Sequence, residues 1–315
     1  MDNQNIITRI SNELGNQMFM YASTLGISKK INKTLLLDNE TAYLSKKNIS
    51  KYGLNNFMIT SSIAPNNLKF LGAYGYIKRK LFKKINNIYP NKSFYIERKN
   101  KDKITQFDNN INSIKFTKNV YFEGYFETEK YFTDIKDLIL KEFSFIDHKK
   151  FIKSPYFQII NNPNSVSICL RQNRFVEGRN NLNTKLNTKK SATFSNEQIT
   201  YINKSISYFQ NRIDKPIFFL WSNDIKNIDL KLFNDKILIV DHDKKFCSSL
   251  DKRCLDLFLI SNCNNHIVIP SSFNWWGAWL SQKKNKLILR PSDKSFSQFT
   301  VNNKDLWPSD WIEID

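Results

Sequence analysis

The fold is indicated most clearly by residues 267–280, IVIPSSFNWWGAWL. The uninterrupted apolar run Ile267–Ile269 is typical of a strand that is buried on both faces of a parallel sheet. Pro270 and two serines follow it, and we predict a helix over Asn274–Gln282. The first N–H groups of a helix have no acceptor within it, so with the serine hydroxyls they make a ready anion site. The stretch therefore predicts a strand–helix unit of an α/β domain, with an anion site where the strand ends.

Strands and helices alternate on both sides of this stretch in the second half of the chain. Ser195 and Gln198 have the spacing of a capping box at the start of a long helix. Such regular alternation predicts a doubly wound α/β domain, whose ligands bind beyond the carboxyl ends of the strands. Arg171, Ser222 and Ser271 are expected at such ends. The predicted strands are Ser165–Arg171, Pro216–Trp221, Lys236–Val240, His266–Pro270 and Leu287–Arg290, and the long helix is Ser195–Arg212.

A second α/β domain is predicted in the first half of the chain. Strand Asn5–Ile10, helix Met18–Ile31 and strand Thr34–Asp38 form a βαβ opening, which implies a parallel sheet. A further strand is predicted at Val120–Phe126, and a helix follows it over Glu129–Phe143.

The boundary between the two domains is expected in the polar segment 147–164, which contains Pro155 and Pro163. We therefore predict one domain at 1–155 and another at 156–315, the second with a C-terminal tail. The chain has 315 residues, of which 41% are hydrophobic, so it is long enough for two domains with cores of their own.

The glycines and cysteines exclude several classes of nucleotide-binding protein. No two of the eight glycines are two residues apart and no Gly-Lys-Ser/Thr occurs, so the dinucleotide-binding fingerprint and the P-loop are absent. Four cysteines without a C-x-x-C pair and three histidines make a zinc site improbable. The N-terminus lacks the features of a signal peptide, and no apolar run approaches the roughly 18 residues needed to span a bilayer. We therefore expect a cytoplasmic protein that uses no metal.

A formal charge of +19 points to anionic partners, and we expect these not to be nucleic acid because no nucleic-acid-binding motif occurs. The most distinct basic feature is the segment Tyr74–Ile88. In it, apolar residues at helical spacing form one side and five cations form the other; these are Ile77, Leu81, Ile85 and Ile88, and Lys78, Arg79, Lys80, Lys83 and Lys84. Two interpretations stay open: a helix that lies on an anionic membrane surface, and an ordinary surface helix with a solvated basic face.

Three segments carry residues suited to binding a sugar nucleotide. Residues 13–22, ELGNQMFMYA, place two amides at a helix start, where they can bond sugar hydroxyls or phosphate oxygens; a plain N-cap by Asn16 is the alternative. In residues 167–175, SICLRQNRF, Arg171 follows an apolar strand and can offer its donors to a diphosphate or to a surface salt bridge. The third segment is 267–280. The polar residues 176–194 predict a mobile lid beside the site or a disordered insertion.

Together these segments resemble glycosyltransferase family 11, the α-1,2-fucosyltransferases. The G-L-G-N-Q-M-F-Q-Y-A loop of that family is matched by Glu13–Ala22, and its S-S-F-S-W-W-G-A stretch by Ser271–Ala278. One segment departs, because the family's H-x-R-R-G-D-Y is CLRQNRF here and keeps only its first arginine, Arg171. Further matches keep the family's order at Glu123–Phe126, Tyr131-Phe132, Trp221–Asp224, Asp256–Ile260, Leu306–Pro308 and Trp311-Ile312.

The resemblance implies a GT-B architecture, in which two Rossmann-like α/β domains face a central cleft, the first on the acceptor side and the second binding the nucleotide sugar. It also implies GDP-fucose as the donor and inversion at the anomeric carbon. Carried over by position, Arg171 and Ser272 would hold the diphosphate, Asp256 would bond the guanine, and Asp224 would support the donor loop. The donor-binding candidates are therefore Arg171, Asp224, Asp256, Ser271, Ser272 and Phe273.

By the same resemblance, Asn16 would face the transferred fucose and the acceptor, which makes it a catalytic candidate beside Arg171. A base that takes the proton of the acceptor hydroxyl needs a carboxylate in a loop near the site. Glu13 and Glu177 both qualify, and we favour Glu177. The remaining candidates for the acceptor and loop side are Gly15, Gln17 and Phe175.

The sequence therefore predicts an inverting fucosyltransferase that moves L-fucose from GDP-fucose to the 2-hydroxyl of a terminal galactose in a surface glycan. Its partners would be GDP-fucose, a galactose-terminated oligosaccharide and, through a peripheral contact, the anionic inner membrane. One alternative is another nucleotide-sugar transferase that holds a divalent metal at Asp241 and Asp243, a D-x-D that follows a predicted strand. A second is a basic protein that binds nucleic acid or a membrane surface and catalyses nothing.

Overall fold

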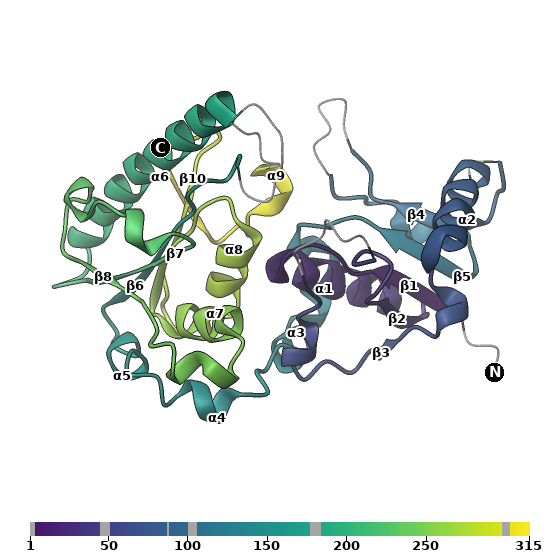
Figure 1. The fold of residues 1–315 in the computed structure, drawn as a ribbon, viewed down its shortest axis with the longest axis horizontal. Helices are drawn as coiled ribbons and strands as arrows, with labels where there is room; N and C mark the ends of the chain where they lie inside the picture. The colour runs from purple at the N-terminus through teal and green to yellow at the C-terminus, as the bar shows by residue number, and fades with distance from the viewer. Residues whose placement is uncertain (1–3, 45–50, 87, 100–105, 177–183, 298–302) are drawn as a thin grey trace. The chain divides into compact units, whose positions relative to one another are not determined.

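A computed structural model describes residues 4–44, 51–86, 88–99, 106–176, 184–297 and 303–315 (Figure 1). The chain divides into two compact units. Unit 1 comprises Met1–Ile146 and Lys304–Leu306, and unit 2 comprises Asp147–Asn303 and Trp307–Asp315. Each unit is built around one parallel sheet, so the predicted α/β class is confirmed.

The sheet of unit 1 has the strand order β3-β2-β1-β5-β4, and every pairing between these strands is parallel. Its strands are β1 (Asn5–Arg9), β2 (Thr34–Asp38), β3 (Ser62–Ile63), β4 (Lys92–Ile96) and β5 (Phe116–Glu123). Its helices are α1 (Leu14–Lys30), α2 (Gly72–Ile85) and α3 (Lys136–Glu142), with 3-10 turns η1 (Leu54–Asn56), η2 (Asn66–Leu68), η3 (Ile111–Ser113), η4 (Glu129–Tyr131) and η5 (Thr133–Ile135). The predicted helix over Glu129–Phe143 is wrong in its first half, where the chain forms two 3-10 turns before α3 begins.

Helix α1 is buried along nearly all of its 17 residues, so it packs as a central element of unit 1 and not as an amphipathic surface helix. Several of its hydroxyl side chains donate hydrogen bonds to backbone carbonyls. The hydroxyl of Thr24 donates to Met20 O at 2.5 Å, and that of Ser28 donates to Leu25 O at 2.8 Å. Ser23 instead reaches out of the helix, because its hydroxyl donates to the carbonyl of Phe126 at 2.8 Å.

The turn after β5 depends on a buried carboxylate. Glu97 accepts hydrogen bonds from the backbone N–H groups of Tyr125 and Phe126, both at 2.7 Å. Phe126 has a φ of 53°, and a Cβ on Gly124 would lie 2.3 Å from the Cβ of Glu97, so only glycine fits there. Burial raises the pKa of Glu97 to about 7. The Gly-Tyr-Phe stretch noted in the sequence is therefore a structural turn fixed by Glu97.

The sheet of unit 2 has the order β11-β10-β9-β6-β7-β8, again with parallel pairings only between these strands. Its strands are β6 (Ser165–Leu170), β7 (Ile217–Ser222), β8 (Ile237–Ile239), β9 (Asn265–Ile267), β10 (Ile288–Pro291) and β11 (Ile312–Ile314). Its helices are α4 (His148–Phe151), α5 (Phe157–Ile160), α6 (Thr184–Gln210), α7 (Lys252–Asn262) and α8 (Ser272–Trp279), with 3-10 turns η6 (Ile225–Asn227), η7 (Leu230–Leu232) and η8 (Phe246–Ser249). α9 (Asn303–Leu306) lies in the C-terminal segment, which ends as the edge strand β11.

Three details of the prediction for unit 2 need correction. Helix α6 begins at Thr184, so Ser195 and Gln198 lie inside the helix and form no capping box. The predicted loop 176–194 is helical from Thr184 onward, and Glu177 lies outside the described residues. The units divide after Ile146 and not after residue 155, because segment 147–164 forms α4 and α5, which pack on α7 of unit 2.

The core of unit 2 joins two of the segments that carry the family resemblance. A Cβ on Gly277 of α8 would lie 2.4 Å from Cγ2 of Ile260 in α7, so glycine permits the close packing of these two helices. Trp275 and Trp276 are fully buried, with ring centroids 5.0 Å apart, and Trp311 from the C-terminal segment lies 5.5 Å from Trp275. The tryptophans therefore form part of the core of unit 2.

The raised pKa of Glu97 gives a pH dependence with a definite sign. The folded chain holds a proton on Glu97 that the unfolded chain has lost at neutral pH, so this group's contribution to stability falls as pH rises from the unfolded pKa through about 7. Glu97→Gln removes the titration. The free energy of unfolding of the wild type, relative to Glu97→Gln, should therefore decrease by about 2 kcal/mol between about pH 5 and about pH 8 in urea titrations. A difference that stays constant or increases with pH contradicts this assignment.

Candidate functional site

The strand order of unit 2 identifies where a ligand would bind. From β6 the chain continues to β7 and β8 on one side, whereas β9 and β10 lie on the other, and Figure 1 shows α6 and α8 on opposite sides of the sheet. In open α/β sheets, ligands bind beyond the carboxyl ends of the strands at such a switch point. Arg171 follows β6, and Ser271 and Ser272 follow β9. The structure thus brings two of the predicted segments together at the switch point.

Arg171 is held in place by an amide from α6. Gln198 is fully buried, and its side chain bonds both backbone groups of Arg171: Oε1 accepts from the N–H at 3.0 Å, and Nε2 donates to the carbonyl at 2.9 Å. The side chain of Arg171 is half-buried at the strand end. We define this pair of hydrogen bonds as the Gln198 clamp. The clamp is not predicted by the sequence, where its only signal is a glutamine at a position that we interpreted as part of a helix cap.

The residues after Arg171 are hydrogen-bonded to the segment that follows β7. The backbone N–H of Gln172 donates to Asn223 Oδ1 at 2.8 Å, and Asn223 Nδ2 donates back to Gln172 O at 2.9 Å. Gln172 Nε2 also donates to the carbonyl of Asp224 at 2.7 Å. The carboxylate of Asp224 accepts from Asn173 and Asn227 at 3.2 and 2.8 Å. Asp224 therefore organises the loop around the site.

Arg174 and Phe175 connect the same loop to α6 and to the segment before α8. Arg174 donates to the carbonyl of Pro270 at 3.3 Å, and its guanidinium lies 5.3 Å from the ring centroid of Phe194. The N–H of Phe175 donates to the hydroxyl of Ser191 at 3.0 Å, and its ring meets that of Phe194 edge-on. The positions at which the chain departs from the family pattern are thus occupied by residues that stabilise the loop.

Ser271, Ser272 and Phe273 begin helix α8 and are all half-buried. Ser271 is the N-cap residue, with extended backbone (φ −147°) and no capping hydrogen bond from its side chain. The segment before it is fixed by Asn274, which is fully buried and accepts from the N–H of Ile269 at 2.7 Å. The N–H groups of the first helical turn, which have no acceptor within the helix, therefore begin beside the end of β9.

Asp256 on α7 forms a pair with a buried histidine. His242 Nε2 lies 2.7 Å from Asp256 Oδ1, and the histidine side chain is 1% exposed against 19% for the aspartate. The ring of Tyr156 meets His242 edge-on, with centroids 5.7 Å apart. Asp256 also lies close enough to Cys169, at the end of β6, to help burial raise the pKa of that thiol. Sequence analysis missed His242, which appeared there only as the middle residue of the D-x-D.

The D-x-D itself forms a turn. Asp243 Oδ1 accepts from the N–H groups of Lys245 and Phe246 at 2.8 and 3.1 Å. Both backbone groups of Asp241 bond the hydroxyl of Tyr156, at 2.8 and 3.2 Å. Within the described residues, no group of three histidine, cysteine, aspartate or glutamate side chains is placed to hold a metal ion.

The predicted residues of unit 1 lie in the first turn of α1. Gly15 is buried and Asn16 is half-buried. Gln17 is fully buried, and its amide is occupied by backbone groups: it donates to Asn12 O at 2.7 Å and Lys51 O at 2.8 Å, and accepts from Gly53 N at 2.8 Å. Gln17 therefore holds two loops together, which corrects its predicted contact with acceptor or phosphate.

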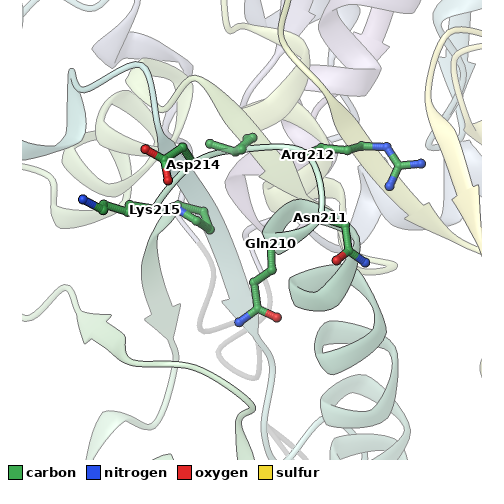
Figure 2. Close-up of a pocket in the computed structure, with 7 residues that line it drawn as sticks. Gln210, Asn211, Arg212, Asp214 and Lys215 are labelled. Atoms are coloured by element: carbon green, nitrogen blue, oxygen red, sulfur yellow. The ribbon is translucent and has the colours of Figure 1, made fainter.

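A surface hollow lined by residues 210–216 lies elsewhere on unit 2 (Figure 2). It is formed by the turn between α6 and β7, at the amino end of that strand. Arg212 stacks on Tyr208 at 3.6 Å, and the side chain of Asn164 donates to the carbonyl of Asp214 at 2.6 Å. The hollow lies at the amino ends of the strands, whereas Arg171 lies at their carboxyl ends. We therefore do not assign the chemistry to the hollow.

Comparisons with known proteins show which family the chain resembles. The family model of Glycosyl transferase family 11 matches residues 77–315. An alpha-1,2-colitosyltransferase of Escherichia coli is 27% identical over 319 residues, covering 98% of this chain and 99% of that protein. The O-antigen biosynthesis glycosyltransferase WbnK of Escherichia coli is 24% identical over 320 residues, covering 97% and 99%.

Among solved structures, the fucosyltransferase NodZ from Bradyrhizobium is similar, with a TM-score of 0.51 and 12% sequence identity, covering 88% of this chain and 91% of that chain. This likeness concerns the fold, and it confirms a GT-B-like architecture with two α/β units. No described helix is long and apolar enough to cross a membrane.

The Gln198 clamp predicts a loss of stability when the amide is removed. Gln198→Leu keeps a side chain of similar size but leaves the N–H and the carbonyl of Arg171 without their partners. The free energy of unfolding should fall by about 2–3 kcal/mol, measured by urea denaturation. Gln210→Leu, on the exposed end of the same helix, should change it by less than about 0.5 kcal/mol. Equal changes in the two variants would show that the clamp contributes nothing.

Proposed function

The chain belongs to glycosyl transferase family 11 and is therefore a glycosyltransferase; we propose that it is an inverting fucosyltransferase that uses GDP-fucose. The proposed acceptor is the 2-hydroxyl of a terminal galactose in a surface glycan. The observation that carries the proposal is that Arg171 and the start of α8 follow the adjacent strands β6 and β9, at the switch point of the sheet.

The chemistry of such a transfer fits these groups. The acceptor oxygen forms a bond to C1 of the sugar from one face, while the bond between C1 and the diphosphate oxygen breaks on the other. Negative charge then grows on the departing GDP, and a fixed guanidinium and helix N-terminal N–H groups stabilise it. Arg171 supplies the first, and the turn at Ser272 and Phe273 supplies the second.

The proton of the acceptor hydroxyl must also leave. A carboxylate is the usual base for such a proton at neutral pH. We propose Glu177 for this role from its place in the sequence beside the Arg171 loop. Glu13, which is exposed at the N-cap of α1 in unit 1, is the alternative.

The nucleotide base is proposed to bind at Asp256. His242 takes one carboxylate oxygen, which holds the side chain in one orientation and leaves the other oxygen to accept hydrogen bonds. Because each carboxylate oxygen has two lone pairs, both oxygens can still accept from the two neighbouring N–H donors on the edge of guanine, whereas uracil offers one. This pairing supports GDP over UDP as the nucleotide.

We further propose that the reaction needs no metal ion. The support is that Asp243, the last residue of the D-x-D, already binds two backbone N–H groups, while Arg171 can neutralise the diphosphate. A metal-dependent transfer through Asp241 and Asp243 is the competing mechanism. Transfer that survives EDTA supports the first, and transfer that EDTA abolishes supports the second.

The donor site can be tested by binding and by activity together. GDP should raise the melting temperature without added metal, and UDP and CMP should not. Arg171→Lys keeps the charge but loses the two-pronged donor geometry, so kcat/KM should fall by about 10²–10³-fold. Arg212→Lys, at the opposite edge of the sheet, is the matched control and should retain activity. Stabilisation by UDP, or an active Arg171→Lys enzyme, would refute the proposed donor site.

GDP-colitose is a second candidate donor, because the chain is 27% identical to an alpha-1,2-colitosyltransferase over nearly its whole length. Colitose is fucose without its 3-hydroxyl group. A site that hydrogen-bonds this hydroxyl discriminates against the deoxy sugar by about 10⁴-fold, because its polar groups would stay unpaired. We expect kcat/KM to be higher for GDP-fucose than for GDP-colitose, with the linkage of the product determined by NMR. The reverse order would assign the enzyme to colitose.

A further inference from the structure

Helix α2 of unit 1 turns its ionic side toward the protein. It lies beside β4 and β5 (Figure 1). Arg79 and Lys83 both pair with Glu123 at the end of β5, and Arg79 Nη2 lies 2.7 Å from Glu123 Oε2. These side chains are 18%, 28% and 9% exposed. Burial alone would raise the pKa of Glu123, but its hydrogen bonds to Arg79 and Lys83 lower it, so the carboxylate stays charged.

Most of the apolar stripe that the sequence shows on α2 consequently faces solvent, whereas Ile85 is half-buried. Tyr74, Ile77 and Leu81 are 77%, 64% and 55% exposed and recur at helical spacing. Ile88 and Tyr89, just beyond the helix, are 76% and 57% exposed. A helix on a water-soluble surface normally buries its apolar side against the core. Here the ion pairs with Glu123 and the packing of Phe82 against the core hold one side of α2 on the unit, so Ile77 and Leu81 are presented outward.

Lysines surround this outward side. Lys80 and Lys84 are exposed, and Lys78 is half-buried. The sequence contains no aspartate or glutamate between Ser61 and Ile96, and Glu123 is already paired with two cations. The outer side of α2 therefore combines aliphatic residues, tyrosines and lysines that form no ion pair with another described residue.

This combination fits one kind of partner. Tyrosines favour the boundary between water and lipid, aliphatic side chains enter the acyl region, and lysines are attracted by anionic headgroups. Nucleic acid would bind the lysines through its phosphates, but it would not bury the aliphatic side chains of Ile77 and Leu81. We propose that the outer side of α2, with Ile88 and Tyr89, docks unit 1 on an anionic lipid surface.

The test is co-sedimentation of the whole protein with vesicles of phosphatidylcholine, with and without phosphatidylglycerol. The wild type should bind the vesicles that contain phosphatidylglycerol, and binding should weaken with salt. Lys80→Glu/Lys84→Glu should lower the partition coefficient at least tenfold. Ile77→Ser/Leu81→Ser should lower it to a similar extent. All four side chains are exposed, so both variants should melt at the wild-type temperature.

Matched controls lie on unit 2. Lys231→Glu/Lys236→Glu makes the same charge change at exposed sites, and Leu230→Ser/Leu232→Ser removes two exposed leucines. Both controls should bind vesicles as the wild type does. Equal losses in controls and α2 variants would overturn the proposal, and so would equal binding to neutral vesicles or no binding at all. A wild-type dimer that Ile77→Ser/Leu81→Ser converts to monomer, without vesicle binding, would instead identify a second copy as the partner.

Discussion

The candidate donor site depends on the Gln198 clamp. A single buried amide satisfies both backbone groups of Arg171 at the point where β6 ends and regular sheet pairing stops. A buried backbone group without a partner is costly, so the clamp restricts the conformations open to this residue. The planar guanidinium of arginine can bind a phosphate group through two parallel hydrogen bonds, and a fixed backbone limits the positions from which it does so. The clamp thus connects the packing of α6 with the chemistry proposed at Arg171.

The loop after Arg171 keeps the first arginine of the family pattern, while the residues beside it differ from that pattern. Gln172 and Asn173 bond the segment that follows β7, and Arg174 bonds the segment before α8. Three strand ends are therefore joined by side chains that are absent from the family pattern. We infer that these residues have a positioning role, and that recognition of the sugar and acceptor rests on other groups.

Polar residues in this protein are repeatedly used for structure, including Gln17 and Asp243, whose positions in the sequence alone suggest ligand binding. Gln17, Asp243 and Gln198 all bond backbone groups, and Glu123 pairs with two cations beneath α2. For Gln17, Gln198 and Glu123, burial makes the internal partner necessary, because an unpaired polar or charged group would be destabilising, whereas the exposed Asp243 fixes a turn. The same requirement orients α2 and leaves its apolar side in solvent.

The sequence by itself determined the α/β class, the order of most elements and the placing of Arg171, Ser271 and Ser272 at strand ends, because apolar runs and their spacing are local properties. Only the tertiary structure decided which polar groups are already occupied and which side of α2 is buried. The deciding partners are remote along the chain: Arg171 and Gln198 are 27 residues apart, and Arg79 and Glu123 are 44 apart. No local pattern encodes such pairs, since they form only when the sheet brings distant segments together.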